Sequence, residues 1–203
     1  MPSVCLYFQV HQPLRIKEYT FFDIGEKHDY FDDKLNLEVL NKVSDKCYLK
    51  ANAILLETLE KMGGKFKVAF SFSGIVLEQL EANRPDVIAS FKKLVDTGYV
   101  EILAETYYHS LAFIFSQPEF DRQVKMHGEK VEQLFGQKPK VFRNTELIYS
   151  NELAQHVAKL GYKGILAEGA DDILGWRSPN YVYKHPEVDL KILTKNYKLP
   201  TKN

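Results

Sequence analysis

The feature that most constrains the fold is a regular alternation of short apolar runs with helical segments. Apolar runs typical of strands occur at 4–10, 66–72, 99–107, 140–145, 163–167 and 190–194. Helical apolar spacing, or a helix start or stop signal, marks 46–62, 75–80, 85–95, 116–136 and 150–160 between them. Strands that alternate with helices in this way indicate βαβ units and a parallel sheet. We therefore predict an α/β fold.

The missing motifs favour a barrel over a nucleotide-binding sheet. No G-x-G-x-x-G follows the first strand, and the chain has neither a G-x-S-x-G elbow nor a P-loop. A complete eight-stranded barrel usually needs about 250 residues, whereas this chain of 203 residues offers about six strands. We predict one irregular (β/α) barrel domain over 1–203 that is truncated at its C-terminal end.

Charge and cysteine content narrow the possible partners. The 27 basic and 27 acidic side chains give a net charge of zero, which argues against a nucleic-acid partner. No apolar run approaches the length of a membrane span, and no signal peptide is evident. Cys5 and Cys47 form no disulfide framework or metal motif. We expect reduced thiols and a cytoplasmic protein.

One segment breaks the alternation. Residues 19–33 read YTFFDIGEKHDYFDD, which combines aromatic and acidic side chains without a helical or strand period. Loops of this length are usually functional or disordered. The aromatic content favours an ordered loop.

Polar side chains gather where the predicted strands end, the edge at which parallel α/β folds place their active sites. Glu146 stands out because apolar residues flank it on both sides, and Pro13 directly after His11-Gln12 favours a rigidly aimed imidazole. A hydrogen-bonded core role for His11 is the alternative. The strand-end polar residues are Gln9, His11, Gln12, Ser71, Ser73, Glu101, Glu105, Tyr107, Tyr108, His109, Arg143, Asn144, Glu146, Glu168, Asp171, Asp172, Trp176 and Arg177.

Two chemistries fit such an edge. Glycoside hydrolysis needs a carboxylate and a carboxylic acid, and aromatic rings can stack on sugar faces. Polysaccharide deacetylation needs a metal-bound water. No zinc-type H-x-x-x-H pair is present, although His11, His109 and Asp171 could combine as ligands from separate strands. We expect the other histidines to lie on the surface: His28, His127, His156 and His185.

Five segments together resemble glycoside hydrolase family 57, in its α-amylase-like branch. They are His11-Gln12-Pro13, 98–102 (GYVEI), 104–111 (AETYYHSL), 142–147 (FRNTEL) and 168–181 (EGADDILGWRSPNY). The resemblance implies an incomplete seven-stranded (β/α) barrel that acts on α-1,4-glucans with retention of configuration. It requires no cofactor and no metal.

The resemblance also assigns roles to individual residues. Glu146 falls on the nucleophile and His11 on a sugar-binding histidine. Glu101 and Asn144 would support the site from behind it. The remaining residues expected to contact an α-glucan or malto-oligosaccharide are Gln12, Glu105, His109, Asp172 and Trp176.

The general acid of the family is an aspartate in a later motif, and nothing in 191–203 matches that motif. We expect this aspartate beyond the chain end. The sequence leaves open whether the activity is hydrolysis, glucan transfer or branching, and it leaves the oligomeric state open. Two alternatives to a glycosidase remain: a non-catalytic α-glucan-binding remnant and a metal-dependent polysaccharide deacetylase.

Overall fold

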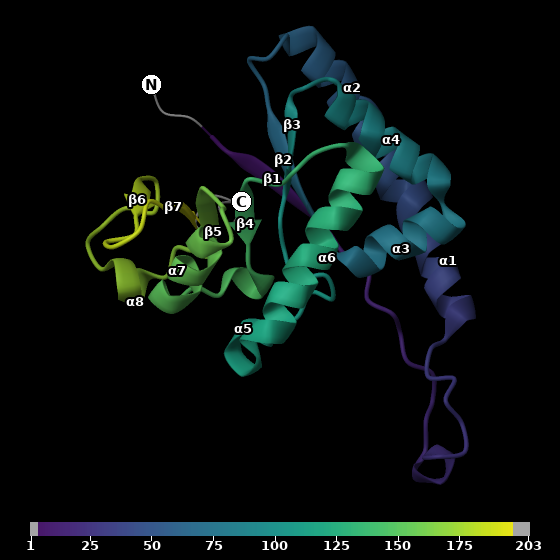
Figure 1. Cartoon of the computed structure of the whole chain (residues 1–203). Coiled ribbons are helices and arrows are strands. Elements are labelled where there is room, and N and C mark those ends of the chain that lie inside the picture. Colours follow the sequence, from purple (N-terminus) through teal and green to yellow (C-terminus); the bar gives the residue numbers. More distant parts are fainter. Residues whose placement is uncertain (1–3, 197–203) are drawn as a thin grey trace.

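The computed structural model describes residues 4–196 and confirms the predicted α/β class (Figure 1). The strands are β1 (Leu6–Val10), β2 (Val68–Phe72), β3 (Val100–Leu103), β4 (Val141–Arg143), β5 (Gly164–Glu168), β6 (Val182–Lys184) and β7 (Lys191–Lys195). The helices are α1 (Asp33–Val43), α2 (Leu49–Met62), α3 (Gly74–Asn83), α4 (Pro85–Asp96), α5 (Ala112–Phe115), α6 (Gln117–Phe135), α7 (Asn151–Lys159) and α8 (Asp171–Leu174).

The strands form two parallel ladders that meet at one point. The first ladder has the order β1-β2-β3, and the second has the order β4-β5-β7-β6. A single parallel bridge between Ala104 and Phe142 joins them. At this bridge the Ala104 N–H donates to the Val141 carbonyl at 2.9 Å, and the Arg143 N–H donates to the Ala104 carbonyl at 2.7 Å. Among the named strands of residues 4–196, β6 is the one that pairs antiparallel, with β7, and the sequence did not predict it.

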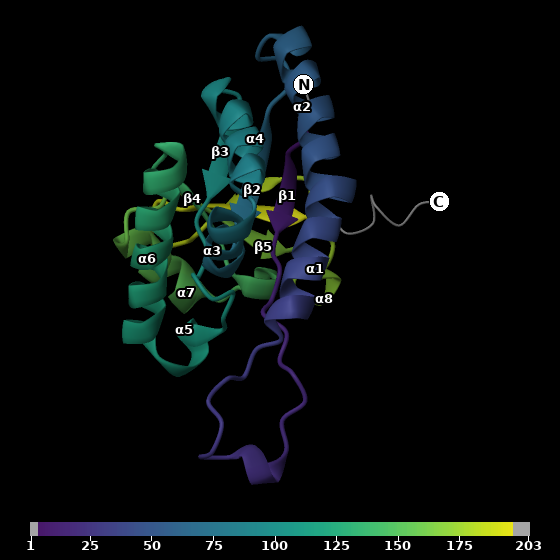
Figure 2. The same cartoon turned by 90° about the vertical axis from the view of Figure 1, so that its right-hand side faces the viewer.

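Two hydrophobic cores correspond to the two ladders. The first packs β1, β2 and β3 against α1 to α4, and the second packs β4, β5 and β7 against α7. Helix α6 spans both, because Phe120 and Val124 enter the second core while Val131 and Phe135 enter the first. In Figure 2, α1, α3, α4 and α6 stand in front of the strands. Helix α6 therefore fastens the two halves together.

The predicted helix boundaries at α6 and α7 are confirmed. The Ser116 hydroxyl accepts a hydrogen bond from the Glu119 N–H at 3.4 Å, and Gly136 ends α6 in the left-handed region at φ 69°. The Ser150 hydroxyl accepts from the Leu153 N–H at 3.1 Å at the start of α7. These contacts satisfy backbone groups that a helix end otherwise leaves unpaired.

Helix α1 was not predicted. It continues through a π-helical turn, Ser44–Tyr48, into α2. Of its residues only Asn36 and Leu40 are buried. A single buried apolar residue is too few to produce a clear helical stripe in the sequence.

The aromatic segment is an ordered loop, as predicted. Residues 14–32 form an arm that projects away from the sheet beyond the end of β1 (Figures 1 and 2). Ile16 and Phe31 pair as an antiparallel bridge, and Phe21–Asp23 forms a 3₁₀ turn at the far end. Phe21 and Phe22 are exposed there. Among the helices of residues 4–196, none combines the length and apolar character that a membrane span requires.

Candidate active site

Three strands, β1, β3 and β4, bring polar side chains together at one edge of the sheet. We call the resulting group the His–Glu cluster; it consists of Gln9, His11, Glu105, His109, Arg143 and Glu146. These residues come from β1, from the segment after β3, and from β4 and the turn that follows it. The parallel direction of the strands explains this convergence, since all of them end at the same edge.

Glu105 is the buried centre of the cluster. Its side chain is fully inaccessible to solvent. The Ser71 hydroxyl donates to one carboxylate oxygen, and His109 Nδ1 lies 3.3 Å from the other. Arg143 Nη1 lies 3.7 Å from Glu105 Oε2. Burial alone would raise the pKa of Glu105, but the hydrogen bonds from His109 and Ser71 outweigh burial and lower it. Glu105 is therefore a buried carboxylate ion.

His109 lies between two carboxylates. Its Nδ1 faces Glu105, and its Nε2 lies 3.4 Å from Glu146 Oε1. Its ring stacks on the ring of His11, with centroids 4.4 Å apart. The backbone of His109 has φ 53°, in the left-handed region. Such a conformation in a non-glycine residue costs energy and is typical of functional sites.

His11 is held in place by Ser73, the first residue after β2. Its Nδ1 forms a 2.6 Å hydrogen bond with the Ser73 hydroxyl. Ser73 also begins α3 by accepting a hydrogen bond from the Val76 N–H at 3.4 Å. Burial is the largest cause of a lowered pKa at His11, and the neighbouring His109 adds to it. The His11 imidazole is therefore neutral near pH 7.

Glu146 is presented to solvent by a strained turn. Its side chain is 72% exposed, and the backbone at Glu146 and Leu147 has φ values of 54° and 58°. Asn144 is buried and donates from Nδ2 to the Ile148 carbonyl at 3.0 Å, which closes the turn. Thr145 Oγ1 lies 3.2 Å from Thr106 Oγ1, which ties the turn to the segment carrying Glu105. Asn144 thus supports the turn that carries Glu146.

Besides Asn144, four of the predicted site residues lie outside this cluster. The Gln12 side chain contacts a residue outside the cluster, where Nε2 lies 3.5 Å from the Tyr48 hydroxyl. Glu101 is the second residue of β3 and is exposed, three positions before the bridge at Ala104. Asp172 on α8 and Trp176 beyond it are exposed at the carboxyl end of β5. The structure also shows contacts with cluster residues for four strand-end residues to which the sequence gave no role. They are Gln9, Ser71, Ser73 and Arg143.

The prediction that the other histidines lie on the surface was wrong for His127 and His185, which are both buried. His127 lies on α6, where its Nε2 donates to the Phe72 carbonyl at 2.7 Å. It follows Val124 by three positions and precedes Val131 by four, so helical spacing turns it toward the sheet. That spacing was a usable signal in the sequence. His28 is exposed, as predicted.

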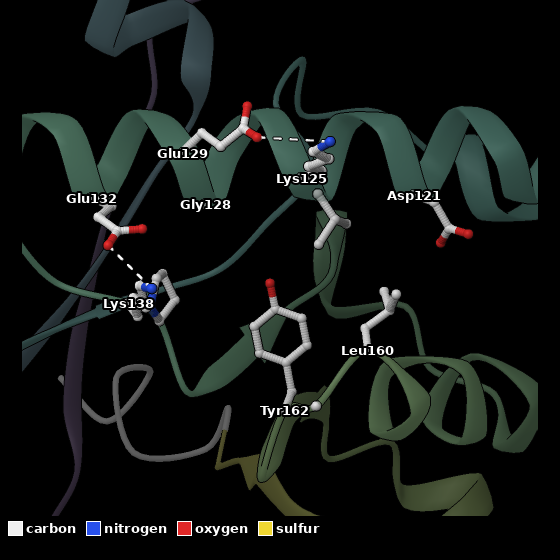
Figure 3. Close-up of a pocket in the computed structure, with 11 residues that line it drawn as sticks. Asp121, Lys125, Gly128, Glu129, Glu132, Lys138, Leu160 and Tyr162 are labelled. Atoms are coloured by element: carbon white, nitrogen blue, oxygen red, sulfur yellow. Dashed lines mark ion pairs between the residues drawn. The ribbon is translucent and has the colours of Figure 1, made fainter.

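A groove of about 540 Å³ lies on another part of the molecule (Figure 3). It runs along α6, and Lys138, Pro139 and Tyr162 on its opposite side precede β4 and β5. Charges at its rim pair with each other, Lys138 with Glu132 at 3.3 Å and Lys125 with Glu129 at 3.9 Å. None of the predicted site residues lines this groove. Over residues 4–196, no group of three or more His, Cys, Asp or Glu side chains could hold a metal ion.

A mainly parallel α/β sheet with carboxylates and histidines at the carboxyl ends of its strands is typical of barrel enzymes. The family model of Glycosyl hydrolase family 57 matches residues 5–203. The chain therefore belongs to this family, and the resemblance seen in the sequence is confirmed.

Curated relatives agree with the family assignment. A protein of Methanocaldococcus jannaschii named "Putative alpha-amylase" is 46% identical over 95% of this chain. An alpha-amylase of Pyrococcus horikoshii is 30% identical over 61% of it. The chain spans 41% of the length of the first relative and 19% of the second.

Solved structures share the fold. The 4-alpha-glucanotransferase of Thermococcus litoralis superposes with a TM-score of 0.70 at 20% identity, over 97% of this chain and 28% of that one. A family-57 branching enzyme of Pyrococcus horikoshii gives 0.70 at 15% identity, over 97% and 47%. The structure of a "putative polysaccharide deacetylase" of Mycobacterium smegmatis gives a TM-score of 0.57 at 15% identity, over 81% of this chain and 53% of that one. The fold alone therefore does not separate glucan-acting enzymes from deacetylases.

Proposed function

We propose that this chain carries the nucleophile of a retaining enzyme that acts on α-1,4-glucans, and that the nucleophile is Glu146. The observation that carries the proposal is the strained turn that holds Glu146 at the edge of the His–Glu cluster with its carboxylate exposed. No lysine or arginine forms an ion pair with Glu146 in the described part of the chain. A carboxylate oxygen that no such cation engages is free to attack an anomeric carbon.

The mechanism follows from a nucleophilic carboxylate. Glu146 attacks the anomeric carbon, the glycosidic C–O bond breaks, and a glycosyl ester forms. A carboxylic acid protonates the leaving oxygen, and we propose that an aspartate outside 1–203 supplies this proton. Water or a sugar hydroxyl then cleaves the ester, which gives hydrolysis or transfer. The geometry of Glu146 is compatible with both outcomes.

Substrate contacts are proposed for residues around Glu146. The His109 ring reaches within 3.4 Å of the Glu146 carboxylate and the His11 ring stacks on it, so both rings are proposed to contact a sugar bound at Glu146. Trp176, which is 95% exposed, offers a ring face on which a sugar can stack, with Asp172 close in sequence. The contacts of Gln12 and Glu101 lend no support to a role in binding. The free thiols of Cys5 and Cys47 favour a cytoplasmic location.

Covalent trapping tests the proposal. The protein is incubated with an α-glucosyl fluoride that carries a second ring fluorine, then digested and analysed by mass spectrometry. The good leaving group needs little help from an acid, so we expect a sugar adduct on the peptide that contains Glu146. Glu146→Gln should abolish the adduct and leave α-glucan binding almost unchanged. Glu101→Gln, a matched change at an exposed carboxylate outside the cluster, should keep it.

Three outcomes would count against a nucleophilic Glu146. An adduct on another residue would assign the nucleophile elsewhere. Glucan binding by the folded protein without any adduct would support the non-catalytic glucan-binding interpretation. Deacetylation that is lost on chelation would support the metal-dependent alternative.

A further inference from the structure

A hydrogen-bond chain fixes the orientation of one side-chain amide in the His–Glu cluster. Arg143 Nη2 donates to Gln9 Oε1 at 2.9 Å. A guanidinium group can only donate, so the oxygen of the Gln9 amide must face Arg143. The amide nitrogen then faces the other way, where it lies 3.2 Å from His109 Nε2. The contact with Arg143 thereby excludes the flipped amide.

The fixed amide determines where His109 carries its proton. An amide nitrogen has donors only, so His109 Nε2 must accept this hydrogen bond and be unprotonated. The proton of the neutral ring is then on Nδ1, which lies 3.3 Å from Glu105 Oε1. Glu105 accepts it as a carboxylate, in agreement with the lowered pKa of Glu105. The series of hydrogen bonds thus begins at the Arg143 guanidinium, which can only donate, and ends at the Glu105 carboxylate, which only accepts.

We propose that Gln9 and Arg143 are positioning residues that hold His109 as the neutral tautomer with its proton on Nδ1. This inference rests on the proposed function, because its consequence concerns Glu146. In this tautomer Nε2, which lies 3.4 Å from Glu146 Oε1, has no proton to donate to that carboxylate. His109 therefore leaves the charge of Glu146 uncompensated.

The surrounding charges explain why such positioning is needed. Glu105 and Glu146 flank the ring on both sides, and two carboxylates favour the imidazolium form. An imidazolium would donate to Glu146 and weaken it as a nucleophile. The Gln9 amide and the Arg143 charge oppose that protonation. The stacked His11 ring is neutral near pH 7 and adds no charge of its own.

Ring-nitrogen NMR tests the tautomer directly. In protein labelled with ¹⁵N-histidine, the signals of His109 are identified from their loss in His109→Gln. We expect the neutral ring to show a protonated Nδ1 and an unprotonated Nε2. Gln9→Glu keeps the acceptor for Arg143 but replaces the donor to His109 by an acceptor, so His109 should become an imidazolium. Gln9→Met removes both contacts and should give mixed forms. Gln133→Glu adds the same charge at an exposed position of α6 and should leave the His109 signals unchanged.

The same variants separate this inference from the proposed function. The rate of Glu146 labelling by the fluorosugar should fall at least tenfold in Gln9→Glu, with little change in α-glucan affinity. A protonated Nε2 in the parent, or an unchanged His109 in folded Gln9→Glu, would overturn the inference. Correct NMR signals without labelling in any protein would uphold the tautomer and refute Glu146 as nucleophile.

Discussion

At the scale of single residues, the buried ion pair of Glu105 and Arg143 organises the candidate site. Both side chains are almost completely buried, and each contacts a second cluster residue, His109 or Gln9. A buried charge without its partner costs several kcal/mol. The pair therefore links stability to the geometry around Glu146.

Glu105→Gln should lower the free energy of unfolding at pH 7 by about 3 kcal/mol, since it leaves the Arg143 charge buried alone. The pKa of Glu105 is lowered in the folded protein, so its contribution is present above the ordinary carboxyl pKa of about 4 and is lost as the pH falls through the lowered value. The difference between parent and variant should therefore shrink below about pH 4. Urea unfolding at several pH values measures it.

The exposed Glu101→Gln serves as the control and should change stability by less than about 0.5 kcal/mol. A difference between the parent and Glu105→Gln that stays constant down to pH 3 would contradict an ionised Glu105.

The sequence predicted which residues lie at the strand ends better than it predicted where their side chains point. Parallel strands end at one edge, so strand-end residues such as His11, His109 and Glu146 could be grouped from their place in the chain. Which side chain turns inward depends on local backbone geometry, which apolar spacing does not encode. Gln12 follows His11 directly but contacts Tyr48 instead of the cluster.

At the scale of elements, the start of α3 supports the segment that carries Glu105 and His109. Gly74 donates from its N–H to the Tyr107 carbonyl at 2.7 Å, and the Tyr107 hydroxyl donates to Glu78 Oε1 at 2.6 Å. A Cβ at Gly74 would lie 2.4 Å from Tyr107 Cγ. The helix and the segment after β3 can pack this closely only because residue 74 has no side chain.

Gly74→Ala should lower the free energy of unfolding by about 1–3 kcal/mol, because the Tyr107 ring has to move. The displaced segment should also slow fluorosugar labelling of Glu146. Thermal unfolding and labelling rates measure the two effects. The control is Gly128→Ala in the interior of α6, where a Cβ would meet open space; it should stabilise the protein by about 0.5–1 kcal/mol. Equal effects of both substitutions would contradict the steric argument.

Element boundaries with a chemical signal were predictable, and those without one were not. Ser116 and Gly136 marked α6 in the sequence and bound it in the structure. Helix α1 lacked a clear apolar stripe and was missed. Strand β6 pairs antiparallel with β7 at the end of a ladder, and its three residues are too few to show a period.

At the scale of the whole molecule, the arm of residues 14–32 stands apart from both cores. None of its residues is buried. Its two ends are adjacent, because the Asp32 N–H donates to the Arg15 carbonyl at 2.9 Å. The arm is therefore an addition to the fold and not a part of its core.

Replacing residues 17–30 by Asn-Gly should change the free energy of unfolding by less than about 1 kcal/mol, since no apolar side chain leaves a core. Asn-Gly suits a two-residue turn between Ile16 and Phe31, which already pair antiparallel. Urea unfolding at two protein concentrations measures the change and separates it from self-association. A loss of several kcal/mol at both concentrations would mean that the arm packs against the body of the protein.

The single bridge between Ala104 and Phe142 makes the candidate site depend on the docking of the two ladders. Gln9 and Glu105 belong to one ladder and Arg143 to the other, so their contacts exist only when both halves have docked. A chain in which the two ladders had not come together would lack these contacts and would have no site. The rate at which Glu146 is labelled should therefore detect a loss of docking between the two ladders that a measurement of helix content would miss.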